Sequence, residues 1–150
     1  MTLMRTLAML LVATALVACE APVGAIYPQT ASARLFVRSY EPGHDELTEV
    51  RALSPDQIGR LRGALHAQAP ELFTAACFVP HHFFRMYDAK GMMIGEIAVC
   101  FCCRGVRARP ALPMPLGTDL GADYESLALL VRELGSTPKV DCEPDEAQGL

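Results

Sequence analysis

Residues 82–103 read HFFRMYDAKGMMIGEIAVCFCC, and the expected fold is built around this segment. Two runs rich in β-branched and aromatic residues, 82–88 and 92–103, surround the sequence Asp88-Ala89-Lys90-Gly91. Aspartate at the start of such a segment and glycine at its end are typical of a type I turn, because glycine adopts the left-handed conformation without steric cost. The stretch therefore predicts a β-hairpin.

The turn also suggests how the two strands pair. If pairing continues regularly from the turn, His82 lies opposite Ala98 and diagonal to Cys100. The same register places Cys77 opposite Cys103. We therefore expect cysteine and histidine side chains to gather at the open end of the hairpin.

Two further strands are expected upstream, at 34–41 and 47–53, where β-branched and aromatic residues are again frequent. Ser54-Pro55-Asp56-Gln57 then predicts the start of a helix, because the serine can cap it, the proline suits the first helical position and the glutamine completes a capping box. The helix is expected to end by Pro70. Its predicted apolar face contains Ile58, Leu61 and Leu65.

The C-terminal part adds one more helix. Residues 104–121 are rich in proline and predict a long extended connection. Residues 122–134 carry a helical stripe of leucine and valine, and Gly135 is a suitable stop. The element order ββαββα predicts an α+β fold, in which two helices cover one face of a small antiparallel sheet made of two hairpins.

The N-terminus has the layout of an export signal. Residues 1–5 carry positive charge, residues 6–17 form an uncharged apolar run, and Leu16-Val17-Ala18-Cys19 follows. These four residues resemble the lipobox of bacterial lipoproteins, which implies removal of residues 1–18 and acylation of Cys19. The residue after the cysteine is Glu20 and not aspartate. By resemblance to the bacterial sorting pattern, this favours an outer-membrane lipoprotein that faces the periplasm. A plain secretory signal, cleaved after Ala15, is the alternative.

The remaining chain divides into three parts. We expect a tether at 19–33, a single α+β domain at 34–135 and a flexible acidic tail at 136–150. The net charge of −4 argues against nucleic acid as a partner, and the 51% hydrophobic content excludes a wholly disordered chain. The expected partners are the membrane, through the lipid anchor, and an unidentified envelope protein.

Three interpretations of the cysteine and histidine cluster remain open. Zinc would be held by Cys77, Cys100, Cys103 and His82, with His81 as the alternative fourth ligand. A structural disulfide of Cys77 with Cys100 or Cys103 suits an exported protein, because the compartment is oxidising. Thiol-redox chemistry would use Cys100 and Cys103 and would need a lowered thiolate pKa.

Two short motifs frame this cluster, Cys77-Phe78-Val79-Pro80-His81-His82 and Cys100-Phe101-Cys102-Cys103. Their arrangement resembles an uncharacterised family of exported bacterial proteins. The signature of that family is Cys-aromatic-x-Pro-basic-His, followed by a hairpin that ends in Cys-Phe-x-Cys. Cys102 occupies the free position and adds a competing thiol. The resemblance implies no particular activity.

The function expected from these observations is that of a lipid-anchored cell-envelope protein. The cluster would stabilise a binding or structural module through a disulfide or a bound zinc ion. The alternative is a metal-handling or thiol-redox protein that uses the same cluster. The sequence contains no nucleophile–base motif, phosphate-binding loop or paired-carboxylate signature, which favours a role other than catalysis.

Overall fold

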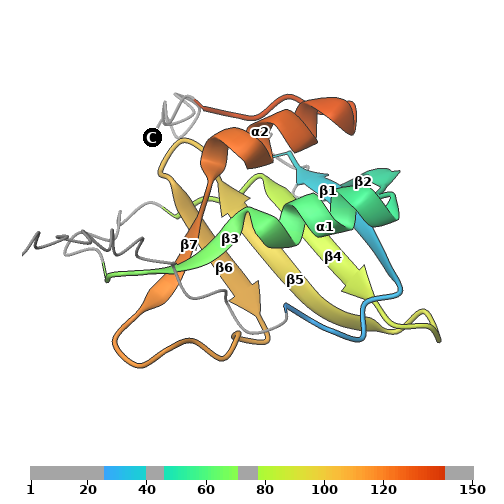
Figure 1. Cartoon of the computed structure of the whole chain (residues 1–150). Helices are drawn as coiled ribbons and strands as arrows, with labels where there is room; N and C mark the ends of the chain where they lie inside the picture. The colour runs from blue at the N-terminus through green and yellow to red at the C-terminus, as the bar shows by residue number, and fades with distance from the viewer. Residues whose placement is uncertain (1–25, 40–45, 71–77, 141–150) are drawn as a thin grey trace, which may run out of the picture.

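The computed structural model describes residues 26–39, 46–70 and 78–140. In chain order the elements are β1 (Ser32–Arg38), β2 (Leu47–Ala52), α1 (Pro55–Gly63), β3 (Leu65–Gln68), β4 (His82–Tyr87), β5 (Met93–Cys100), β6 (Gly105–Arg109), β7 (Asp119–Ala122) and α2 (Tyr124–Glu133). A five-stranded antiparallel sheet has the order β2-β1-β4-β5-β6, and β3 pairs with β7 in a second sheet. Both helices lie on one face of the larger sheet (Figure 1). The fold is α+β.

The turn between β4 and β5 is the one expected from the sequence. The Asp88 N–H donates to the Met92 carbonyl oxygen at 2.9 Å, and Gly91 has a φ of +78°. The Asp88 carboxylate also accepts hydrogen bonds of 2.9 Å from the backbone N–H groups of Lys90 and Met92. The turn is therefore stabilised by its own aspartate and by a glycine in the left-handed region.

The register beyond this turn differs from the prediction. Met86 pairs with Gly95 while Tyr87 pairs with Met93, so Ile94 is an extra residue in β5. Such a bulge shifts all later pairs by one position. As a result His82 lies opposite Val99 and not opposite its predicted partner.

The element order also differs from ββαββα. The predicted extended connection at 104–121 contains two strands, β6 and β7. β6 extends the predicted second hairpin by a third strand, and its alternating arginines lie on the face of the sheet away from the helices. The predicted first helix is shorter than expected, because Leu65 belongs to β3 and pairs with Ala122.

The helix boundaries follow the expected capping signals. Ser54 accepts a hydrogen bond from the Gln57 N–H, and the Gln57 side chain accepts one from the Ser54 N–H, which confirms the capping box. Asp123 caps α2 by accepting from the N–H groups of Glu125 and Ser126. Gly135, with a φ of +88°, follows the end of α2 as predicted.

The core lies between the sheet and the two helices. Leu35, Phe84 and Ile97 project from the central strands and are fully buried. Helical residues that are similarly buried are Leu61, Leu127, Leu130 and Val131. Side chains alternate along a strand, so the residues on either side of Phe84 in β4 and of Ile97 in β5 face the surface of the sheet away from the helices.

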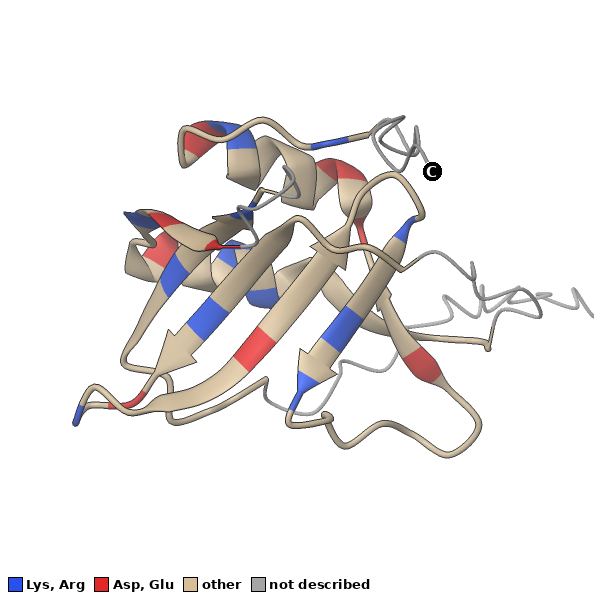
Figure 2. Ribbon diagram, turned by 180° about the vertical axis from the view of Figure 1, so that it is seen from behind, with Lys and Arg blue, Asp and Glu red and all other residues tan. Residues whose placement is uncertain are grey.

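That opposite surface carries arginines paired with carboxylates and aromatic rings. Figure 2 shows this face of the sheet, with basic and acidic positions on neighbouring strands. The Arg85 Nε donates to Glu96 at 2.8 Å, and the Arg85 guanidinium lies 4.7 Å from the centre of the Phe36 ring. Arg107 stacks on Phe78 at 4.2 Å. These contacts give the outer surface of the sheet a structured covering of long side chains.

The described structure includes residues 26–33, the last part of the segment expected to be a tether. Ile26 and Tyr27 are buried, and the Tyr27 hydroxyl donates to the Pro110 carbonyl oxygen at 2.6 Å. Burial raises the pKa of Tyr27 to about 12. The Tyr27 ring occupies the space where a Cβ of Gly95 would lie, and Arg62 donates to the backbone of both buried residues.

At the other end of the domain, Pro138, which belongs to the segment expected to be a flexible tail, is buried. Residues 141–150 lie outside the described residues, as do Cys19, the export signal and the first part of the tether. No helix in the described ranges is long and apolar enough to cross a bilayer.

Replacement of Gly95 by alanine tests the packing of Tyr27. We expect Gly95→Ala to reduce the free energy of unfolding by about 1–3 kcal/mol, because the new methyl group overlaps the Tyr27 ring. Urea unfolding of the full-length chain measures the change. Gly59→Ala is the control, since nothing lies within 4 Å of its added methyl group, and it should stabilise α1 by up to about 1 kcal/mol. Equal effects of the two substitutions would contradict the packing.

Candidate functional site

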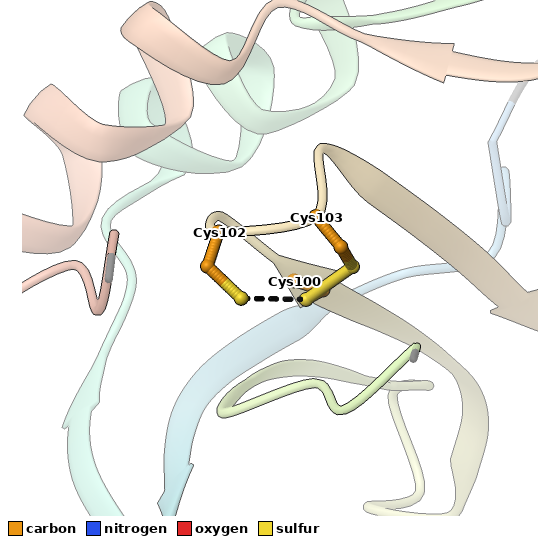
Figure 3. Close-up of side chains that lie close together, drawn as sticks. All are labelled: Cys100, Cys102 and Cys103. Carbon is orange, nitrogen blue, oxygen red and sulfur yellow. Dashed lines mark hydrogen bonds between the residues drawn. A yellow bond between two sulfur atoms is a disulfide. The ribbon is translucent and has the colours of Figure 1, made fainter. Parts of the chain in front are cut away.

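Three cysteines meet in the tight connection between β5 and β6. Cys100 is the last residue of β5, and Cys102 and Cys103 lie in the turn that follows. The three Sγ atoms lie within 4.8 Å of one another (Figure 3). Arg104 completes the turn with a φ of +47°, and its N–H donates to the Phe101 carbonyl oxygen at 3.4 Å. The local chain reversal therefore brings the sulfur atoms together.

Cys100 and Cys103 form a disulfide with a Cα–Cα distance of 5.6 Å. The Cys102 Sγ lies 3.6 Å from the Cys100 Sγ. The structural disulfide considered from the sequence joined Cys77 to one of these residues, but Cys77 lies outside the described residues. The observed bond is instead the pair that the thiol-redox interpretation required.

The three sulfur positions differ in their exposure. Cys100 is 1% exposed, whereas Cys102 and Cys103 are partly exposed. Cys103 also lines a cavity of about 380 Å³, together with Arg104, Tyr124 and residues of β6 and β7. A small ligand can thus approach the cluster through Cys103, while Cys100 anchors it to the protein interior.

Cationic and aromatic side chains surround this entrance. The Arg104 guanidinium lies 5.1 Å from the centre of the Tyr124 ring. On the other side of the turn, the Phe78 ring lies against Gly105, and the Arg107 guanidinium stacks on the same ring. Any side chain at Gly105 would overlap the Phe78 ring, so this glycine permits the close approach of the two segments.

The predicted fourth ligand, His82, lies on the other face of the sheet. Its partner Val99 points toward the helices, and the next residue, Cys100, points away from them. His82 contacts the Phe101 ring edge-on, with ring centres 5.1 Å apart. The predicted register had placed His82 and Cys100 on one face, so the bulge in β5 removes His82 from the site.

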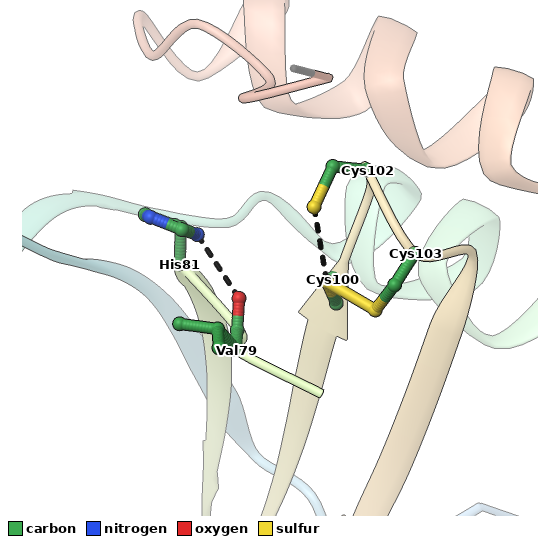
Figure 4. Close-up of a disulfide and its surroundings, with 5 residues drawn as sticks. All are labelled: Val79, His81, Cys100, Cys102 and Cys103. Carbon is green, nitrogen blue, oxygen red and sulfur yellow. Dashed lines mark hydrogen bonds between the residues drawn. A yellow bond between two sulfur atoms is a disulfide. The ribbon is translucent and has the colours of Figure 1, made fainter. Parts of the chain in front are cut away.

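His81, the alternative ligand, also points elsewhere. Its Nδ1 donates to the Val79 carbonyl oxygen at 3.1 Å, and the rest of the ring extends away from the sulfur atoms (Figure 4). Of the metal ligands expected from the sequence, the described residues bring together Cys100 and Cys103. Cys102 joins them, although the sequence suggested only a competing thiol. The presence of three cysteines within four residues was the signal that identified the cluster.

Comparisons with known proteins do not assign this arrangement. No protein-family model, curated protein or solved structure matches the chain.

The environment of His82 produces a testable pH dependence. Burial lowers the pKa of His82 to about 4, and the backbone of Thr137 opposes this shift only in part. In the unfolded chain the pKa is near its ordinary value of about 6.5. Folding therefore favours the neutral form of the His82 imidazole. The resulting contribution to the free energy of unfolding is present above pH 6.5 and is lost as the pH falls toward 4.

We expect this loss to reach about 3 kcal/mol, from the difference between the two pKa values. Urea unfolding between pH 7 and pH 4 measures it. His82→Phe keeps an aromatic ring without a titrating nitrogen, so its free energy of unfolding should fall less over this range. An identical pH dependence in both proteins would refute the assignment to His82.

Proposed function

We propose that this chain is a lipid-anchored cell-envelope protein whose three-cysteine turn binds a thiophilic metal ion when its thiols are reduced. The observation that carries the proposal is the grouping of Cys100, Cys102 and Cys103, whose sulfur atoms lie within 4.8 Å of one another. Thiolates are soft ligands, and a group of this size can coordinate a single ion. The partly exposed Cys102 and Cys103 allow the ion to enter and leave.

A purely structural role explains the cluster less well. The Cys100–Cys103 bond spans a sequence separation of 3, so the chain-entropy model assigns it only about 2 kcal/mol of stabilisation. A bond from Cys77 to Cys103 would give about 3.5 kcal/mol in the same model. In addition, β5 and β6 already pair next to the bond, at Cys100 and Gly105. The disulfide thus connects segments that the backbone holds together.

The ligand set favours a soft monovalent ion. Zinc in structural sites takes four ligands, and the predicted histidine ligand lies on the opposite face. Three thiolates without an imidazole suit Cu(I), which accepts soft ligands at low coordination number. Zinc remains the alternative if another group, such as Cys77, supplies the fourth ligand.

Thiol-redox chemistry is the second candidate, and the Cys100–Cys103 disulfide favours it. Oxidation of these two thiols forms the bond with release of two protons and two electrons to an oxidised thiol partner, whose own disulfide is reduced. The exposed edge of Cys103 at the 380 Å³ cavity gives such a partner access. Because the same sulfur atoms serve both reactions, disulfide formation would also release a bound ion.

The location is proposed from the N-terminal sequence. The apolar run at 6–17 and the lipobox-like Leu16-Val17-Ala18-Cys19 support export and acylation of Cys19. Acyl chains on this cysteine would add about 0.8 kcal/mol for each buried methylene, so several chains hold a protein on the bilayer almost irreversibly. We place the protein at the outer membrane, facing the periplasm.

Metal titration of the reduced full-length chain tests the metal site. We expect one equivalent of Cu(I) to bind, and Cys102→Ser to weaken binding by about tenfold or more, because a hydroxyl is a poor ligand for a soft ion. Competition with a chromophoric Cu(I) chelator measures the affinity. Cys142→Ser removes a thiol outside the turn and is the control. Undiminished binding by Cys102→Ser, together with loss of binding in Cys77→Ser, would replace the proposed ligand set by the one expected from the sequence.

Cell fractionation tests the anchor. Cys19→Ala should move the protein from the membrane fraction to the soluble envelope fraction, because no acyl chain can attach to alanine. Mass spectrometry of the purified wild-type protein should show an acylated Cys19 at its N-terminus. A membrane distribution that is unchanged by Cys19→Ala would contradict the lipid anchor, and it would leave the metal titration unaffected.

A further inference from the structure

Two connections lie at the same end of the sheet, the turn between β4 and β5 and the segment 110–118 between β6 and β7. Figures 1 and 2 show both along the lower edge of the domain, seen from opposite sides. The segment that precedes β1 runs between them. The Tyr27 hydroxyl donates to the Pro110 carbonyl oxygen at 2.6 Å, and a few residues later the Ala31 N–H donates to the Tyr87 carbonyl oxygen at 2.8 Å. The described part of the chain therefore begins at this end of the domain.

Both connections present apolar side chains to solvent. Leu116 is fully exposed, and Met92 and Met93 are 65% and 54% exposed. An ordered turn holds Leu116 in this position, because the Thr118 N–H donates to the Pro115 carbonyl oxygen at 3.1 Å across it. None of these three apolar side chains is part of the core, so packing within the domain does not explain their presence at this end.

The proposed acylation site is attached at the same end. Cys19 precedes the buried Ile26 by seven residues. A fully extended chain covers at most about 3.6 Å per residue, so Ile26 lies within about 25 Å of the acylated residue. An acyl anchor on Cys19 would thus hold this end of the domain close to the bilayer, and it would raise the effective concentration of lipid surface at the two connections.

Charge attraction does not dominate this end of the domain. The charged residues in the two connections and directly beside them are Asp88, Lys90, Arg109 and Asp119, two of each sign. The segment 110–118 itself contains no charged residue. A contact with lipid at this end therefore depends on its apolar side chains, and it should be insensitive to salt.

We propose that this end of the folded domain rests on the lipid bilayer, with Leu116 and Met92 inserted at the boundary between headgroups and acyl chains. The inference rests on the proposed lipid anchor, and it adds a contact made by the domain itself. β5 runs from Met93 to Cys100, so the cysteine turn lies at the other end of that strand. The thiols would then face away from the bilayer, toward the ions and thiol partners of the periplasm.

Tryptophan fluorescence tests the contact, because the chain contains no tryptophan of its own. Acylated Leu116→Trp is purified from membranes and reconstituted in phosphatidylcholine vesicles. We expect its emission to lie at shorter wavelength than that of a water-exposed indole, and brominated phosphatidylcholine should quench it, because the ring lies among lipid groups. Met92→Trp should behave in the same way. High salt should leave both emission spectra unchanged, since the contact is apolar.

Leu129→Trp is the matched control, since Leu129 is a 55% exposed leucine on α2, away from both connections (Figure 1). Its emission should be that of a water-exposed indole, and brominated lipid should not quench it. Urea unfolding verifies that each variant is folded. A water-exposed indole in acylated Leu116→Trp would overturn the contact and leave the anchor intact. Equal quenching of Leu116→Trp and Leu129→Trp would also overturn it, because tryptophan itself would then drive insertion. A mass spectrum without acyl chains would instead refute the anchor on which the inference rests.

Discussion

The bulge at Ile94 is the constraint on which the arrangement of the whole sheet depends. One extra residue in β5 places Met86 opposite Gly95 and His82 opposite Val99. Because strand side chains alternate between two faces, a shift by one residue exchanges the face on which a side chain lies. The bulge thus directs Ile97 and Val99 into the core under the helices, and it leaves Cys100 on the other side.

This division produces two chemically distinct regions at one end of the sheet. The three sulfur atoms lie at the end of β5 and in the turn that follows, next to a cavity lined by arginines and a tyrosine. The His82 ring lies on the helix side, within a cavity that contains cationic and hydroxyl groups. Phe101 belongs to the cysteine turn and contacts His82, so it forms the packing connection between the two regions.

The thiol cluster depends on local structure much more than the His82 cavity does. Three of the four residues from Cys100 to Cys103 are cysteines, and one turn with Arg104 in the left-handed region brings their sulfur atoms together. The cavity, in contrast, requires β1, β4 and the segment after α2 to meet. Small distortions of the domain should therefore affect the His82 cavity before they affect the thiol cluster.

The features that could be predicted from the sequence are those that need only neighbouring residues. The capping box at Ser54 and Gln57, the turn closed by Asp88 and Gly91, and the concentration of cysteines after Val99 all act through contacts a few residues apart. The register of β5, the pairing of β3 with β7 and the packing of Tyr27 over Gly95 could not be predicted, because they arise from contacts between distant parts of the chain. These features depend on which distant surfaces bury each other. A bulge adds one residue without a distinctive sequence, and a buried tyrosine in a proline- and alanine-rich segment has no local pattern that separates it from a tether.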